Sequence, residues 1–174
     1  MTHTVRVALE SDIPAMMQVI DEAKTYFKEN EIDQWQDGYP NQYSLLLDIE
    51  NRFSYVMVDN LTQQVVATAA ITQGPEEAYN DITGAWLTGD ATTYLAVHRI
   101  AIASALKGNN LAKQLIDYAE QLCLQKNCLS VRIDTHEDNL SMQKFVGKHG
   151  YTKCGDIYIP DVGDRIAYEK IIKE

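Results

Sequence analysis

Small polar residues flanked by lysines separate a strand-like apolar run from an amphipathic helix in the middle of the chain. The stretch reads KGNNLA over residues 107–112. A strand that turns through small residues into a helix leaves several backbone N–H groups unpaired, with the positive end of the helix dipole behind them. Gly108 lets the backbone approach a ligand closely, and Lys107 and Lys113 add positive charge. These residue types fit a site for a phosphate or diphosphate group.

The same stretch lacks the two common nucleotide-binding patterns. The chain contains neither the GxxxxGK[ST] pattern of P-loop proteins nor the GxGxxG pattern of dinucleotide-binding folds. Taken alone, Gly108, Asn109 and Asn110 favour a simpler interpretation, a tight strand-to-helix connection that binds nothing. The neighbouring elements have to decide between the two interpretations.

Strands and helices alternate around this stretch. Residues 92–103 are strand-like, and the helix after the stretch has apolar residues at i, i+4, i+7, i+8 and i+11. A further strand over residues 129–133 leads through the segment THEDN into another helix, for which Gly150 is a natural C-terminal cap. The apolar faces of the two helices comprise Leu111, Leu115, Tyr118, Ala119 and Leu122 in the first and Met142, Phe145, Val146 and His149 in the second.

The flanking regions complete a mixed α/β pattern. Residues 5–9 alternate between apolar and polar and predict a first strand, which a helix with Pro14 in its first turn follows. Asn41 is the expected N-cap of a short second helix. The remaining expected elements are an antiparallel hairpin of residues 53–58 and 65–71, a long loop over residues 72–90, and a C-terminal hairpin formed by KCGDIYI and RIAYEKII.

Composition and charge restrict the possible partners. The 174 residues, 45% of them hydrophobic, suffice for one domain with a sizeable core, which we expect to span residues 1–174. A formal net charge of −10 argues against nucleic acid and anionic membranes and attracts a cationic substrate such as an amine. The N-terminus lacks the apolar segment of a signal peptide, so we expect a cytoplasmic protein. Three cysteines without CxxC spacing indicate neither a disulfide framework nor a zinc site, and we expect no metal.

With these elements in place, the sequence resembles the GNAT superfamily of N-acetyltransferases over nearly its whole length, and most strongly over residues 94–151. In that family a strand ending in an aliphatic residue precedes the pattern [RQ]xxGx[GA], and here Ile102 ends the strand before KGNNLA. Lys107 stands where Arg or Gln is usual, and Asn110 stands where Gly is usual. Asparagine still donates its backbone N–H and tolerates left-handed backbone angles.

The resemblance implies a fold and a co-substrate. The fold would be an α/β domain with a mixed, mostly antiparallel twisted sheet, splayed central strands and helices on both faces. Acetyl coenzyme A would lie with its pantetheine arm between the splayed strands, pairing like an extra strand, and with its diphosphate on the backbone amides of KGNNLA. The implied cofactor-binding residues are Ile100, Ala101 and Ile102 for the arm, Lys107, Gly108, Asn109, Asn110, Leu111 and Ala112 for the diphosphate, and Asn139 for the arm as well as for capping its helix.

Two positions bear on the catalytic chemistry. An amine must lose a proton before it attacks, and His98 is the candidate base, because some family members place His or Glu on that strand. The alternative is a hydrogen-bonded histidine half buried in a sheet, and His136 and Glu137 are weaker candidates for the same role. Many family members use a Tyr to protonate the departing thiolate at the position that is Val146 here.

The acceptor and the assembly follow from the resemblance only in outline. Trp35, Tyr39 and Trp86 lie in irregular segments and are candidates for holding a small-molecule or peptide amine, or else anchors of their loops. The resemblance implies a homodimer, from family habit. We therefore expect acetyl transfer to a primary amine by direct attack in a ternary complex, and the alternative is a non-catalytic acyl coenzyme A binding or sensing domain that has lost the acid.

Overall fold

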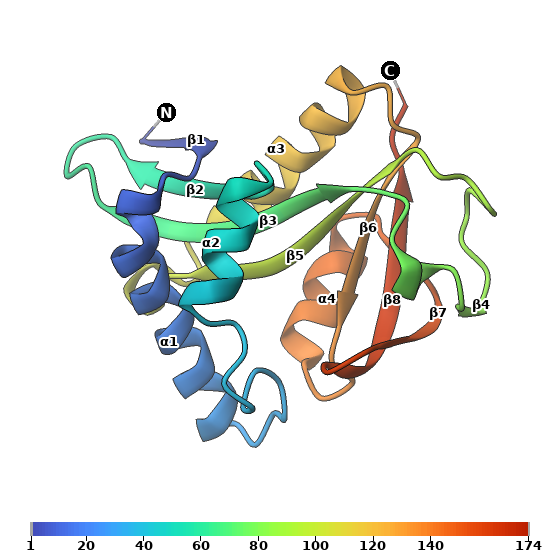
Figure 1. Ribbon diagram of the computed structural model, residues 1–174, viewed down its shortest axis with the longest axis horizontal. Helices are drawn as coiled ribbons and strands as arrows, with labels where there is room; N and C mark the ends of the chain where they lie inside the picture. Colours follow the sequence, from blue (N-terminus) through green and yellow to red (C-terminus); the bar gives the residue numbers. More distant parts are fainter. Residues whose placement is uncertain (1, 174) are drawn as a thin grey trace. The chain divides into compact units, whose positions relative to one another are not determined.

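The computed structural model describes residues 2–173, which form eight strands and four α-helices. The hydrogen-bonded strands follow the order β1-β2-β3-β5-β6-β8-β7-β4 (Figure 1). The strands are β1 (His3–Val7), β2 (Ser54–Asp59), β3 (Val65–Gln73), β4 (Thr83–Gly84), β5 (Tyr94–Ile102), β6 (Ser130–Thr135), β7 (Thr152–Ile159) and β8 (Gly163–Ile171). The helices are α1 (Ile13–Glu29), α2 (Gln42–Glu50), α3 (Leu111–Gln125) and α4 (Leu140–Lys148).

The sheet is mixed and mostly antiparallel, as the sequence predicted. Strands β5 and β6 pair in parallel, whereas β1–β2, β2–β3, β6–β8, β7–β8 and β4–β7 pair antiparallel. Both predicted hairpins are confirmed as β2–β3 and β7–β8. No helix among residues 2–173 is both long enough and apolar enough to span a bilayer.

The chain forms two compact units that interleave in sequence. The first consists of the chain up to Ile71 together with His98–Tyr118, and the second of Thr72–Val97 together with the chain from Ala119 on. Strands β3 and β5 and helix α3 each contribute residues to both units. The expectation of one domain over residues 1–174 stays a prediction.

In the first unit, α1 and α2 pack on the hairpin strands around one core. Met16 and Ile20 of α1, Leu45 of α2 and Val56 of β2 belong to a single buried cluster. The predicted local signals are present at the start of both helices. Pro14 lies in the first turn of α1, and the Asn41 side chain caps α2 by accepting the Ser44 N–H at 3.0 Å.

In the second unit, the core lies among β5, β7, β8 and the segment after β3. Its centre comprises Tyr79, Trp86, Tyr94, Ala96, Ile157 and Ala167. The segment that we expected to be a long loop contains a 3-10 turn, Glu77–Tyr79, and the two-residue strand β4. Gly84 pairs with Gly155 there, and a side chain at either position would collide with the opposing backbone carbonyl, so two glycines are needed for this close approach.

The first strand ends earlier than predicted. Residues 5–9 were expected to form it, whereas β1 ends at Val7 and a 3-10 turn, Glu10–Asp12, follows. The Asp12 carboxylate accepts the Leu9 N–H at 2.8 Å and pairs with Arg6 at 2.7 Å. These contacts turn the chain into α1 before Leu9 can continue the strand.

Candidate active site

The backbone between β5 and α3 contains a turn with two left-handed residues, and we call residues 108–110 of this turn the nest. Gly108 has φ of +84° and Asn110 has φ of +65°, whereas Asn109 between them is not in the left-handed region. The N–H groups of Lys107 and Asn109 donate to the carbonyls of Ser104 and Leu106 at 3.3 and 3.2 Å, so these two groups are engaged within the turn. The helix begins directly afterwards at Leu111, where Asn110 accepts the first helical bond from Gln114 at 3.2 Å. The N–H groups of the nest and of the first helical turn are therefore adjacent in the chain.

The two unusual positions of this stretch have different structural reasons. Gly108 needs its conformational freedom, and a Cβ atom there would meet nothing within 4 Å, so the space beside it is open. Asn110 adopts a left-handed conformation in which a family member normally has glycine, and asparagine is among the residues that tolerate it. The departure from the family pattern at Asn110 thus preserves the backbone path.

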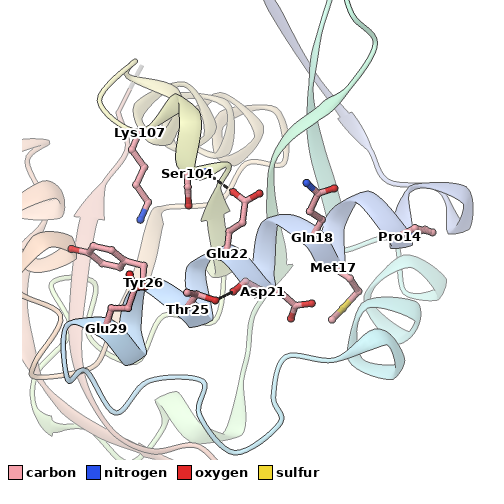
Figure 2. A pocket seen from close by; sticks show the side chains of 10 residues that line it. All are labelled: Pro14, Met17, Gln18, Asp21, Glu22, Thr25, Tyr26, Glu29, Ser104 and Lys107. Carbon is pink, nitrogen blue, oxygen red and sulfur yellow. Dashed lines mark hydrogen bonds between the residues drawn. The ribbon is translucent and has the colours of Figure 1, made fainter.

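A short turn before the nest is attached to helix α1. The turn Ser104–Leu106 precedes Lys107, and the Glu22 carboxylate accepts the Ser104 N–H at 2.6 Å. Figure 2 shows Glu22 and Tyr26 on the side of α1 that faces Ser104 and Lys107. The Lys107 ammonium lies 3.5 Å from the centre of the Tyr26 ring, a cation–π contact. Both contacts fix the entrance of the nest to α1.

A groove of about 770 Å³ runs along this side of α1 and reaches Lys107. Its charged lining includes Asp21, Glu22 and Glu29, while Lys107 is the cation at its edge (Figure 2). Burial lowers the pKa of Lys107, and the carboxylates of Glu22 and Glu29 oppose that shift. The sequence predicted positive charge beside the nest, and the structure places that charge over an aromatic ring.

Strand β5 is irregular at the residue after His98. Arg99 has φ of +51°, which is unusual for a non-glycine residue inside a strand. Its guanidinium donates to both carboxylate oxygens of Asp48, from Nε and Nη2, at 2.7 Å each. Its Nη1 donates to the Tyr39 hydroxyl at 2.5 Å. Two side chains from α2 and the segment before it thus hold this irregular point of β5.

His98 is half-buried and lies close enough to Asp48 to act on it electrostatically. Burial raises the pKa of Asp48, and Arg99 and His98 oppose that shift. The predicted base His98 and the predicted acceptor residue Tyr39 therefore both lie next to the partly buried Arg99–Asp48 pair. No sequence pattern indicates that pair, because its members are 51 residues apart and belong to different elements.

The residues predicted to hold the pantetheine arm continue the same strand. Ala101 is buried in the core of the first unit, while Ile100 and Ile102 are half-buried on either side of it. In the second unit, the parallel pairing of β5 with β6 runs from Tyr94–Ser130 to Val97–Ile133. Strand β5 continues past that last pair to Ile102.

The tryptophans predicted for the acceptor pocket anchor their segments. Trp35 packs against the core of the first unit and edge-on against Phe27, with 5.4 Å between ring centres. Trp86 is buried in the core of the second unit, and its indole N–H donates to the Tyr79 carbonyl at 2.9 Å. Trp86 also lines a cavity of about 370 Å³ in the second unit. These contacts match the loop-anchor interpretation, and acceptor binding by either tryptophan stays a prediction.

Asn139 and Val146 lie in helix α4 and its cap. The Asn139 side chain is buried and accepts the Met142 N–H at 3.1 Å, which is the capping role expected for it. Val146 is 0% exposed. The position that carries a hydroxyl in many family members is therefore an apolar core residue in this chain.

A buried polar network that sequence reasoning missed lies in the second unit. Glu169 of β8 is 0% exposed and accepts from Ser130 at 2.5 Å, from the Thr88 hydroxyl at 2.6 Å and from Arg132 Nε at 3.0 Å. The Arg132 guanidinium lies over the ring of Trp86, 4.1 Å from its centre. This network ties the segment after β3 to strands β6 and β8.

Comparisons with known proteins agree with this architecture. The family model described as "Acetyltransferase (GNAT) family" matches residues 16–151. A GNAT-family acetyltransferase from Streptococcus agalactiae 2603 is 34% identical, with 99% of this chain and 96% of that chain covered and a TM-score of 0.87. The chain belongs to the GNAT family of N-acetyltransferases. The enzyme class expected from the sequence is confirmed.

More distant GNAT structures share the fold. A GNAT-family acetyltransferase from Listeria monocytogenes 4b F2365 is 20% identical, with 97% and 94% of the two chains covered and a TM-score of 0.75. The PaiA N-acetyltransferase from Thermoplasma acidophilum, solved in complex with coenzyme A, is 14% identical, with 98% and 99% covered and a TM-score of 0.70. A comparison with curated proteins gave no match.

Proposed function

We propose that this GNAT protein transfers the acetyl group of acetyl coenzyme A to a primary amine of a small molecule or peptide, by direct attack in a ternary complex. The observation that carries the proposal is the alternating backbone at Gly108 and Asn110 in front of α3. This arrangement matches the chemistry of a diphosphate, which accepts several backbone N–H bonds at a helix start. The coenzyme A complex of the PaiA relative supports the choice of co-substrate.

The proposed binding residues divide by the part of the co-substrate that they hold. Residues 107–112 bind the diphosphate, with the backbone N–H groups of Gly108, Asn110 and the first turn of α3 as donors. Residues 100–102 of β5 pair with the pantetheine arm through backbone groups. Asn139 contributes through its side chain in addition to capping α4. The Lys107 ammonium contributes positive charge to diphosphate binding, because Lys107 directly precedes Gly108. It does so either from its place over the Tyr26 ring or after leaving that ring.

The proposed chemistry requires a neutral amine. An alkylammonium has a pKa of about 10, so it must lose a proton at neutral pH. His98 takes that proton, directly or through a water molecule, because the pKa of histidine lies near neutrality. The Arg99–Asp48 pair beside His98 holds the irregular part of β5, and with it the orientation of the His98 side chain.

The acceptor is proposed to be cationic before it reacts. The net charge of −10 attracts such a molecule, and Asp21, Glu22 and Glu29 concentrate negative charge along α1. Tyr39 is the predicted acceptor residue whose hydroxyl lies at the Arg99–Asp48 pair, next to His98. We propose a cytoplasmic enzyme, and a homodimer as its assembly.

One observation favours a second candidate function. Val146 is an apolar core residue where many family members have the acid that protonates the thiolate. A protein that binds acyl coenzyme A and senses it without turnover would need no such acid. Release of free thiol from acetyl coenzyme A, measured with a panel of polyamines, amino acids and peptides, separates the two. Release with any acceptor supports the enzyme, whereas saturable binding without release on all of them supports the sensor.

A variant of the nest tests the binding step. Gly108→Val is expected to weaken coenzyme A binding about 10- to 100-fold, because a β-branched residue does not adopt φ of +84° and the N–H groups would turn away. Titration calorimetry of the folded variant measures the affinity. Gly38→Val is the matched control, since Gly38 has φ of +79° and equally open space but lies outside the nest. Equal affinities of the two variants would contradict the assignment of the nest to the diphosphate.

A further inference from the structure

The side chain of Lys107 lies against helix α1. Lys107 directly precedes the nest, yet its ammonium is 3.5 Å from the centre of the Tyr26 ring, toward which its side chain extends in Figure 2. Both residues belong to the first compact unit. The cation that is adjacent in sequence to the nest is therefore already bound by another part of the same unit.

Acidic side chains lie around the ammonium in this position. Glu22 and Glu29 line the groove that reaches Lys107. Both act on Lys107 electrostatically, since they oppose the lowering of its pKa by burial. Glu22 is also fixed beside the turn, because its carboxylate accepts the Ser104 N–H at 2.6 Å. The Tyr26 ring and the two carboxylates thus hold an alkylammonium, which is the protein's own.

A diphosphate is a poor partner for the ammonium in that position. It is itself negatively charged, so to reach Lys107 over the Tyr26 ring it would also have to approach Glu22 and Glu29. Repulsion from the two carboxylates cancels part of the attraction that a single ammonium supplies. A diphosphate bound to the nest therefore gains most from Lys107 once the side chain has left α1.

The Lys107 side chain can leave α1 without a movement of the main chain. The Lys107 N–H donates to the Ser104 carbonyl at 3.3 Å, which holds the backbone of the turn. Lys107 is exposed, and a lysine carries its ammonium on a flexible stem. A cation–π contact at an exposed site is also weak. Exchange of the ammonium between two partners thus requires only rotation about side-chain bonds.

We propose that Tyr26 holds the Lys107 ammonium away from the diphosphate site until coenzyme A binds, and that Lys107 then moves from the ring to the diphosphate. This role rests on the proposed function. Tyr26 and the diphosphate compete for one ammonium, so the affinity for coenzyme A is reduced by the fraction of molecules in which Lys107 lies on the ring. Tyr26 therefore sets the affinity for the co-substrate without any contact with it.

Titration calorimetry with coenzyme A tests the competition. Tyr26→Leu is expected to tighten binding about two- to tenfold, because the ammonium loses its partner on α1 and is available to the diphosphate. Tyr26→Phe is the matched control, since it keeps the aromatic face and loses only the hydroxyl, and its Kd should stay within about twofold of the wild type. An unchanged or weaker affinity of Tyr26→Leu overturns the proposal, and a weaker one shows instead that Tyr26 presents Lys107 to the diphosphate.

A double-mutant cycle separates this effect from a general change in α1. Lys107→Met removes the ammonium and is expected to weaken coenzyme A binding. In the Lys107→Met background, Tyr26→Leu should leave the Kd unchanged, because no ammonium remains for the ring to hold. Tightening that persists in that background overturns the proposal, since Tyr26 would then act without Lys107.

Nuclear magnetic resonance of the wild-type protein observes the movement directly and does not depend on the folding of a variant at position 26. With carbon-13-labelled lysine, the methylene protons next to the Lys107 ammonium should resonate upfield of those of other lysines, because they lie over the Tyr26 ring, and Lys107→Met identifies them. Saturating coenzyme A is expected to abolish this upfield shift.

The outcomes of this measurement have distinct meanings. An upfield shift that is absent before coenzyme A is added, or that persists at saturation, overturns the proposal. No binding of coenzyme A by the wild type would overturn the proposed function itself and this role with it. Binding without these changes would overturn the role of Tyr26 alone.

Discussion

The Glu169→Gln variant is expected to lose about 3–5 kcal/mol in free energy of unfolding. The Glu169 carboxylate is fully buried, and the Arg132 side chain that pairs with it is 3% exposed. Glutamine keeps the shape of the side chain but leaves the buried guanidinium without a counter-charge. The measurement is urea unfolding followed by tryptophan fluorescence, since Trp86 stacks on Arg132 and reports on this network.

An exposed ion pair provides the control for this prediction. Lys113 and Asp117 pair at 2.5 Å on the surface of α3, with 36% and 44% of their side chains exposed. Asp117→Asn is expected to cost at most about 0.5 kcal/mol, because solvent screens such pairs. Equal stability of the Glu169 and Asp117 variants would show that the buried network contributes nothing beyond a surface pair. A double variant with apolar residues at both Arg132 and Glu169 should recover much of the loss.

The same network gives a pH dependence with a defined sign. Burial alone would raise the pKa of Glu169, but hydrogen bonds from Ser130, Thr88 and Arg132 outweigh it and lower the pKa below its usual 4.5. A lowered pKa in the folded state stabilises the protein at pH values above the unfolded pKa, and this contribution is lost as the pH falls through the folded pKa. The stability difference between wild type and Glu169→Gln should therefore be constant from pH 7 to about pH 5 and shrink below about pH 4.5.

The order of elements was predictable because local patterns determine it. Residues 111–122 repeat with helical spacing, Asn41 has the side chain of a helix cap, and the two hairpins alternate around turn residues. Each of these signals acts within about 20 residues of sequence. Strand β4 escaped prediction because its two residues are defined by a partner strand, Gly84 against Gly155, and not by any periodicity of their own.

The candidate site was predictable only where its chemistry resides in the backbone. The turn before α3 could be recognised because glycine and asparagine are the residues that adopt left-handed angles, and both Gly108 and Asn110 do so. The Arg99–Asp48 pair and the contact of Lys107 with Tyr26 could not be found in this way. A salt bridge and a cation–π contact between distant elements exist only once the chain has folded.

Residue type alone left two interpretations of the aromatic side chains open. Tryptophans in irregular segments were candidates for an acceptor pocket or for loop anchors, and Trp35 packs against the core of its unit while Trp86 is buried in the other core. Tyr39 differs from them, because its hydroxyl binds a charged group next to His98. The side chains that lie at the irregular point of β5, Tyr39, Asp48 and Arg99, are thus better candidates for setting acceptor geometry than the tryptophans.

His98→Gln is expected to lower kcat about 10²- to 10⁴-fold, the usual contribution of a general base, with coenzyme A affinity unchanged. Glutamine approximates the size and hydrogen bonding of histidine but cannot accept a proton at neutral pH, so it separates proton transfer from packing. His98→Ala should show a similar kcat. The measurements are thiol release under saturating acetyl coenzyme A and calorimetry of each folded variant.

A base and a structural residue at position 98 differ in whether stability, coenzyme A affinity and turnover fall together in the variants. If His98 only supports β5, His98→Gln should retain most activity, and His98→Ala should lose stability, affinity and turnover in parallel. His136→Ala is the control, since His136 is the other histidine considered as base and lies at the end of β6 with its side chain at the turn to Asp138. If His98 is the base, His136→Ala should remain active. The rate of His98→Gln should then no longer rise with pH near neutrality, because that variant has no histidine at position 98 to accept the amine proton.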